Sequence, residues 1–264
     1  MKTISTMFNI TRIHNALNSV SFSRRVLDLA YNYAPKRKAF NKTLDQLPLH
    51  MQTLMEQEVE FQGIFHLAFY TASLLDKTET PSSNNAHNNK LLRLLTPVAK
   101  LFTAKINLKI QSEILESFGG VGYLEDSGIP KWLRDSQTLS IWEGTTNVLS
   151  LDVLRSITKE GTYKAWQQEM FTLIETLSDD SLESGRLKVK KGLKDLNQFV
   201  HSFESIDKEH IESQARHFAF SIAKITISTL MLTFAQKYKG NRKEFYIATA
   251  LSYSNKNLFN ISVE

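Results

Sequence analysis

Apolar residues recur every three or four positions along most of the chain, and this spacing limits the folds it can adopt. It marks residues 13–34, 54–75 and 91–106, and each of these stretches is longer than a typical strand. A period near 3.6 residues is that of an α-helix that buries one stripe of its surface. Strand-like alternation, as in "ITISTLMLTF", is short and has helix-favouring neighbours. The pattern predicts an all-α protein.

Proline and glycine predict where these helices begin and end. Pro35 would end the first helix, and Pro48 suits the first turn of the second. The pair Gly119 and Gly120 would end the third helix, within which Pro97 would make a kink or mark the true first turn. The polar, Asn-rich segment 76–90 lacks periodicity, which predicts a mobile loop between the second and third helices.

The rest of the chain divides into two parts. A short helix is expected near 131–139 and another after Glu143, whereas three or four less sharply patterned helices should follow Gly161. We therefore predict an antiparallel up-down helical bundle over residues 1–158, with an appended helical segment over residues 159–264. The acid-poor N-terminus has the composition of a mitochondrial transit peptide as well as that of a bundle helix.

Composition excludes several kinds of chemistry. None of the 264 residues is cysteine, so disulfides, thiolate catalysis and zinc-thiolate sites are impossible, and no His-Glu-x-x-His motif suggests another metal site. The densest apolar run, residues 217–234, contains Lys224 and several hydroxyls, which suits a buried helix better than a membrane span. The net charge of +5 allows a phosphate-bearing ligand or nucleic acid, although a solvated basic surface explains it equally well.

The stretch "LSIWEGTTNVLSLDVLR", residues 139–155, contains the leading catalytic candidate. Glu143 stands between Trp142 and a glycine, just before a helix that Thr145 or Thr146 would cap. A large aromatic neighbour removes water from a carboxylate, which favours a role as general base. The alternative is a glutamate that only caps the helix.

Other residues suggest a bound ligand less strongly. Gly119 and Gly120 would let the backbone approach a flat or phosphorylated ligand, or would only stop a helix. Arg37 and Phe40 could offer a fork for phosphate and a ring face, or form a charged turn. Arg12 lies on a largely apolar face, so it should either reach solvent or pair with an anion. The basic clusters at 185–196 and 237–244 could contact nucleic acid, but a solvated helix face is the simpler reading.

Three ordered stretches together resemble one known family. "RKAF", "ESFGGVGYLEDSGIPKWLRD" and "IWEGTTNVLSLDVLR", in this order, resemble the C-terminal helical domain of the flavin-dependent acyl-CoA dehydrogenases, in particular the alkylation-response, AidB-like branch. The resemblance covers roughly residues 10–158 and, more loosely, the tail. It implies FAD as the cofactor, an acyl-CoA as the substrate and assembly into a dimer or tetramer.

The resemblance also implies roles for single residues. Glu143 would remove the α-proton of the thioester, and its backbone N–H would help to stabilise the resulting charge at the thioester carbonyl. Arg12 would lie near this base and the substrate. Some members place the base at the position of Thr11, which cannot serve. The residues implied to contact FAD are Arg37 and Phe40, on a neighbouring subunit's cofactor; Glu116, Gly119 and Gly120, at its diphosphate and adenosine end; and Thr145 and Asn147.

The chain also departs from the family pattern. Asn41 replaces the usual glycine after Phe40, and Glu116 stands where many members have glutamine. Complete members carry an N-terminal helical domain and a middle β-domain before this region, so we expect little activity from this chain alone. We also expect a cytoplasmic or mitochondrial protein that is not secreted. Two other functions stay open: a non-catalytic oligomerisation module, and a nucleic-acid-binding, AidB-like protein.

Overall fold

The computed structural model describes residues 2–80, 85–259 and 261. Most of these residues are helical, which confirms the all-α prediction. The strands among them are β1 (Lys38–Ala39) and β2 (Lys42–Thr43), which form a small antiparallel hairpin with Lys38 opposite Thr43. The hairpin turn needs left-handed backbone at Phe40 (φ 51°) and Asn41 (φ 62°).

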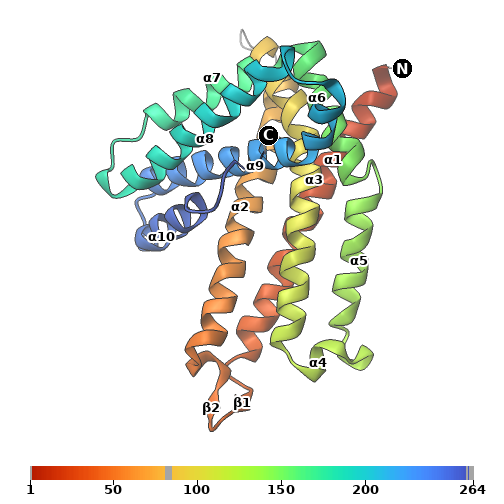
Figure 1. The fold of residues 1–264 in the computed structure, drawn as a ribbon. Coiled ribbons are helices and arrows are strands. Elements are labelled where there is room, and N and C mark those ends of the chain that lie inside the picture. Colours follow the sequence, from red (N-terminus) through yellow and green to blue (C-terminus); the bar gives the residue numbers. More distant parts are fainter. Residues whose placement is uncertain (1, 81–84, 260, 262–264) are drawn as a thin grey trace.

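Four helices run side by side to form the bundle (Figure 1). Three of them are long, namely α1 (Lys2–Tyr33), α2 (Pro48–Glu79) and α3 (Asn85–Ser117), and α5 (Pro130–Ile141) is shorter. The β1–β2 hairpin and the short helix α4 (Gly120–Tyr123) lie together at one end, which we call the hairpin end. The turn from α5 into α6 (Thr146–Glu160) lies at the opposite end, which we call the base end after Glu143, the base expected from the sequence.

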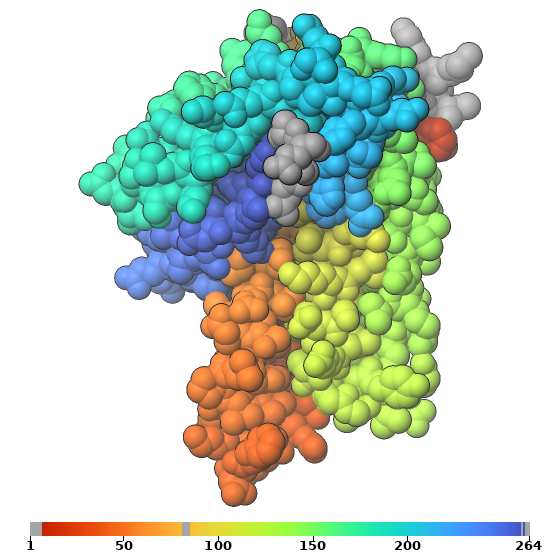
Figure 2. Space-filling model, viewed as in Figure 1, coloured from red at the N-terminus to blue at the C-terminus, as the bar shows by residue number. Residues whose placement is uncertain are grey.

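Four further helices pack beside the bundle, as predicted for the region after Gly161. They are α7 (Thr162–Glu175), α8 (Glu183–His201), α9 (Lys208–Lys237) and α10 (Lys243–Ser254). Short 3-10 turns lie at Leu44–Gln46, Glu125–Ser127, Asp180–Leu182 and Ser202–Glu204. Figure 2 shows these helices over the base-end half of the bundle, whereas the hairpin end stands clear of them on this face.

One continuous hydrophobic core joins the bundle to the four appended helices. It runs from Ile13 on α1 through Leu95 on α3 to Trp166 on α7 and Ile222 on α9. Trp166 is fully buried, and its indole N–H donates to the hydroxyl of Thr226 over 2.9 Å. Because of this shared core, α9 is a buried helix as expected: it is long and apolar enough to cross a membrane, but 78% of its most apolar window is buried inside the protein.

The predicted loop at 76–90 is mostly wrong. Helix α2 continues to Glu79 and α3 begins at Asn85, so of the described residues only Thr80 lies between them, and residues 81–84 lie outside the described part. Asn-rich sequence lowers helix propensity, but tertiary packing overrides so weak a preference. Pro97 is also not in a first turn: it is buried in the interior of α3, between Leu95 and Val98 of the core.

Candidate functional site

Glu143 lies on a turn whose backbone is unusual. Its φ angle is 57°, in the left-handed region, and that of Gly144 is 111°. A bulky residue with positive φ is uncommon and costs of order 1–3 kcal/mol, so neighbouring contacts must hold it there. Gly144 also has little space beside it, because a Cβ atom at this position would lie 2.9 Å from the Leu149 side chain.

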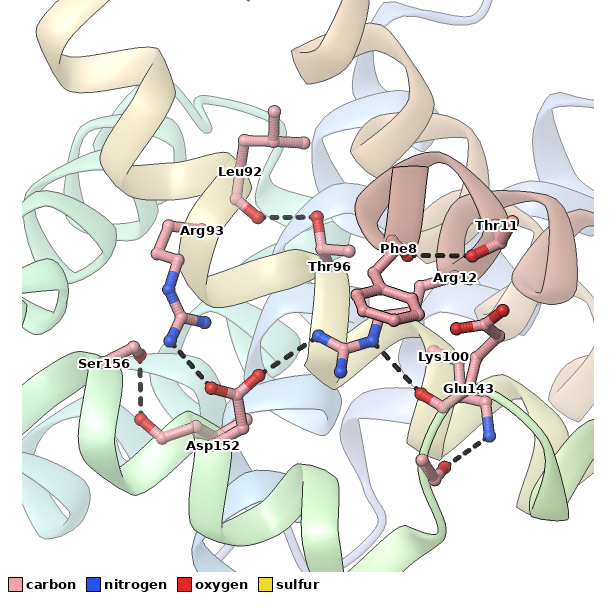
Figure 3. A network of polar contacts seen from close by, with 12 residues as sticks. Phe8, Thr11, Arg12, Leu92, Arg93, Thr96, Lys100, Glu143, Asp152 and Ser156 are labelled. Atoms are coloured by element: carbon pink, nitrogen blue, oxygen red, sulfur yellow. Dashed lines mark hydrogen bonds and ion pairs between the residues drawn. The ribbon is translucent and has the colours of Figure 1, made fainter. Parts of the chain in front are cut away.

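Two cations from other helices hold this turn. The Nε of Arg12 on α1 donates to the carbonyl oxygen of Glu143 over 3.2 Å (Figure 3). The Nζ of Lys100 on α3 donates to the carbonyl oxygen of Gly144 over 2.7 Å. Lys100 has no exposed surface, and burial and the charge of Arg12 lower its pKa to about 8, although the charge of Glu143 opposes this shift. Consecutive carbonyls of the turn are thus fixed by hydrogen bonds from charged donors.

A carboxylate on α6 in turn fixes Arg12. Oδ2 of Asp152 lies 3.2 Å from the guanidinium of Arg12, and Oδ1 lies 2.7 Å from that of Arg93 on α3. Arg93 also pairs with Glu160 at the end of α6, over 2.9 Å. Helices α1, α3 and α6 are therefore joined by one ion-pair network beside the Glu143 turn (Figure 3). The expectation that Arg12 pairs with an anion is met by Asp152.

The side chain of Glu143 points away from this network. Figure 3 shows its carboxylate on the side of Phe8 and Thr11, whereas Asp152 lies on the other side of Arg12. The hydroxyl of Thr11 donates back to the carbonyls of Met7 and Phe8 within its own helix. The Glu143 side chain is half-buried, and 45% of Trp142 is exposed. The backbone of Glu143 is therefore held in place, while its side chain stays partly exposed.

Thr145 and Asn147 follow this turn at the start of α6. Of the two predicted N-cap residues, Thr145 and Thr146, it is Thr145 that occupies the N-cap position. Its side chain makes no capping hydrogen bond. Asn147 lies in the first turn of α6, and both residues are exposed. Their polar side chains therefore lie beside the Glu143 turn and face solvent.

The other predicted residues gather at the hairpin end. A groove of about 630 Å³ is lined there by Arg37, Glu116, Gly119 and Gly120, together with residues such as Tyr33 and His50. A Cβ atom added to either glycine would meet nothing within 4 Å, so this wall is open to a ligand. Phe40, at the tip of the β1–β2 hairpin, is 91% exposed.

The predicted site residues thus form two clusters at opposite ends of the bundle. Arg12 and Tyr33 are separated by twenty-one residues of α1, which corresponds to about 30 Å at 1.5 Å per residue. The base-end cluster holds Arg12, Glu143, Thr145 and Asn147. The hairpin-end cluster holds Arg37, Phe40, Glu116, Gly119 and Gly120.

Sequence reasoning missed three charged residues of the base end. Lys100 stands in the apolar run "LTPVAKLFTA", and Asp152 interrupts the apolar face of "NVLSLDVLR". A charge inside an apolar helical stretch signals a buried partner. The partner of each, and the part played by Arg93, depend on how three helices pack, which the spacing does not reveal.

The basic clusters at 185–196 and 237–244 add no candidate nucleic-acid site, and the described residues add no candidate metal site. Lys190 pairs with Glu175 over 2.6 Å, Lys191 with Asp195 over 2.5 Å, and Lys243 with Asp179 over 3.2 Å. These pairs neutralise part of the charge that nucleic acid would need. Within the described ranges, no group of three or more His, Asp or Glu residues could hold a metal ion.

Comparison with known proteins agrees with the resemblance. The family "Acyl-CoA dehydrogenase, C-terminal domain" matches residues 1–158, and "Acyl-CoA dehydrogenase 11 C-terminal domain-like" matches residues 162–264. The chain is 42% identical to acyl-CoA dehydrogenase family member 11 of Caenorhabditis elegans over 238 residues, which are 88% of this chain and 38% of that protein. It is 34% identical to the putative acyl-CoA dehydrogenase AidB of Escherichia coli, over 62% of this chain and 29% of AidB.

A solved structure shows the same fold. The crystal structure of Caenorhabditis elegans ACDH-11 in complex with C11-CoA superposes with a TM-score of 0.90 at 38% identity, covering 98% of this chain and 44% of that one. The chain therefore spans less than half of the relatives that it matches. It belongs to the acyl-CoA dehydrogenase family, of which it carries the C-terminal domain.

Proposed function

We propose that this chain supplies the catalytic base and part of the cofactor site of an FAD-dependent acyl-CoA dehydrogenase. The observation that carries this proposal is the Glu143 turn, whose left-handed backbone is held by Arg12 and Lys100 while its carboxylate stays accessible. A capping glutamate would not need two charged donors to fix its backbone. A base needs such support, because proton transfer depends on its exact distance from the substrate.

In the proposed reaction Glu143 removes a proton from the α-carbon of an acyl-CoA thioester. When bound, FAD would accept the hydride that leaves the β-carbon, so that a double bond forms between the two carbons. The charge that develops at the thioester carbonyl would be stabilised by hydrogen bonds, one of them from the backbone N–H of Glu143. Arg12 holds the carbonyl on the other side of the same residue and thereby orients it.

The residues at each end of the bundle fit a part of a dinucleotide. At the base end, Thr145 and Asn147 are polar, exposed and next to the Glu143 turn. At the hairpin end, Arg37 offers a guanidinium for phosphate, and Gly119 and Gly120 leave the groove wall open. Glu116 and the exposed ring of Phe40 could contact the ribose and adenine portions.

The separation of the two clusters favours an oligomer. With about 30 Å of helix between them, the base end and the hairpin end of one chain would serve different FAD molecules. In a homodimer or homotetramer, Arg37 and Phe40 would reach the FAD of a neighbouring chain, so that both clusters would contact a cofactor. The hairpin end protrudes and is uncovered on the face that Figure 2 shows, which suits such a contact.

Exchange of the substrate α-proton tests the base without requiring hydride transfer. The probe is an acyl-CoA with eleven acyl carbons, because a relative was crystallised with C11-CoA. In deuterated water, the chain loaded with FAD should catalyse the loss of the α-proton NMR signal. Glu143→Gln should slow this exchange by about 10²–10⁴-fold, the usual contribution of a general base.

The matched control is Glu204→Gln, which changes an exposed glutamate on the 3-10 turn Ser202–Glu204. It should leave the exchange rate unchanged. Equal rates for Glu143→Gln and the unmodified chain, or no exchange above the rate in buffer, would contradict the proposal.

A further inference from the structure

A second groove lies where the bundle meets the appended helices. It has a volume of about 480 Å³, and both parts line it: Asn147, Ser150 and Leu151 come from α6, and Glu212, Arg216 and His217 are among the residues from α9. The α6 residues lie in the first family match, and the α9 residues lie in the second. The groove therefore exists only because the two parts pack together.

Apolar contacts join the two walls of this groove. Leu154 on α6 forms a small hydrophobic cluster with Ile211 and Ala215 on α9, against which Phe203 and Ile206 also pack. Ala215 lines the groove as well, so the cluster fixes the distance between its walls. Asn147 stands on the α6 wall only four residues after Glu143.

Arg216 is held in this groove by an aromatic ring. Its guanidinium carbon lies 5.6 Å from the centroid of Phe220, which in turn packs edge-on against Phe102 of α3 at 5.1 Å. Arg216 is exposed, and it forms no ion pair with any of the carboxylates that the structure describes. The nearby Glu212 is occupied by Lys208, 3.7 Å away. The result is an oriented guanidinium whose donors are free to bind an anion.

We propose that this groove binds the diphosphate of a nucleotide ligand, with Arg216 as the main charged contact and the Asn147 amide and His217 as further donors. The proposal rests on the proposed function and extends it, because it assigns a ligand contact to the appended helices. Both FAD and coenzyme A carry such a diphosphate, and Asn147 of the groove lies four residues after Glu143. Glu212, on the rim, is placed to accept hydrogen bonds from ribose hydroxyls.

The test compares the unmodified full chain with Arg216→Gln and Arg216→Lys, using three probes: FAD, coenzyme A and inorganic pyrophosphate. Dissociation constants come from calorimetric titration at low salt. We expect Arg216→Gln to weaken binding of pyrophosphate and of one of the two nucleotides by about tenfold or more, and Arg216→Lys to lose less. The nucleotide whose affinity falls identifies the source of the diphosphate.

The matched control is Arg155→Gln, which removes an exposed arginine of α6 that does not line the groove. It should leave all three affinities unchanged. Equal losses in this control would show a general charge effect and overturn the assignment.

If FAD binds and Arg216→Gln leaves its affinity and that of the other probes unchanged, the groove proposal fails while the proposed function stands. If pyrophosphate and coenzyme A bind through Arg216 but FAD never binds, the groove stands and the dehydrogenase function fails. Absence of binding by all three probes would overturn the groove proposal.

Discussion

The two ends of the bundle are built in different ways. At the base end, Arg12, Lys100 and Asp152 come from three helices and fix the turn that carries Glu143. At the hairpin end, Phe40 is 91% exposed and Gly119 and Gly120 face open space. One end is completed by contacts within the chain, whereas the other offers its residues outward.

This difference shows which parts of a site a single chain can preorganise. In the proposed function Glu143 is a base that must be held at a fixed distance from the reacting atoms, and its strained backbone is held by partly buried hydrogen bonds from charged donors. Residues that serve a ligand held mainly by a neighbouring subunit need only be presented at the surface. Substitutions at the base end should therefore change stability much more than those at the hairpin end.

The largest expected effect is on the pH dependence of stability, through Lys100. Its pKa is lowered from 10.5 to about 8 in the folded chain, so between these values the unfolded chain binds more protons. Burying the protonated Lys100 lowers the free energy of unfolding, and this loss is fully present below about pH 8. The free energy of unfolding should therefore rise as pH increases from about 8 to about 10.5. The total is on the order of 3 kcal/mol at 1.36 kcal/mol per pKa unit.

Urea unfolding of the chain and of Lys100→Met at several pH values measures this effect. The contributions of all other ionisable groups cancel in the difference between the two proteins. The difference in unfolding free energy should change in favour of the unmodified chain as pH rises. Parallel curves would mean that Lys100 is not held as a buried cation.

A smaller loss is expected when the carboxylate behind the turn is removed. Asp152→Ala leaves Arg12 and Arg93 without their shared partner, which should cost about 2 kcal/mol, less than for a fully buried pair because both guanidinium groups keep some contact with water. Asp195→Ala, which breaks the exposed pair with Lys191, should cost less than about 1 kcal/mol. Similar losses in denaturant unfolding for the two variants would show that the Asp152 network does not brace the turn.

Glycine substitutions compare the two ends directly. Gly144→Ala meets both a positive φ of 111° and the Leu149 side chain, so we expect a cost of about 1–2 kcal/mol. Gly120→Ala meets nothing within 4 Å and should stay within about 0.5 kcal/mol of the unmodified chain. Thermal unfolding followed by circular dichroism gives both values, and a larger cost at Gly120 would reverse the proposed contrast.

The smallest effect should come from Phe40→Ser. Because the ring is 91% exposed, its removal should change the unfolding free energy by less than about 0.5 kcal/mol. The same substitution should weaken FAD binding, since a ring face for the cofactor is lost. A large loss of stability would show instead that Phe40 packs within its own chain in solution.

Much of the fold could be predicted from local patterns. Pro48, Gly119 and the spacing of apolar residues placed the helix boundaries because proline and glycine act on the backbone locally. The extension of α2 and α3 into the Asn-rich segment could not be predicted, because tertiary packing overrides the weak helix propensity of that segment. Motifs brought out Glu143 and Arg37, but not their location at opposite ends of the bundle or the contact between Lys100 and Gly144. Those features depend on which helices become neighbours.

The most direct test of the contrast between the two ends is whether FAD is retained only by an oligomer. The chain is mixed with FAD, desalted, and sedimented while absorbance is followed in both the protein and the flavin bands. We expect the flavin to travel with an oligomer, Arg37→Ala to release the flavin without dissociating that oligomer, and the neighbouring control Lys38→Ala to retain it. Flavin that travels equally well with a monomer, or that is unaffected by Arg37→Ala, would contradict the account. An oligomer that never holds flavin would mean that this chain serves for assembly and not for catalysis.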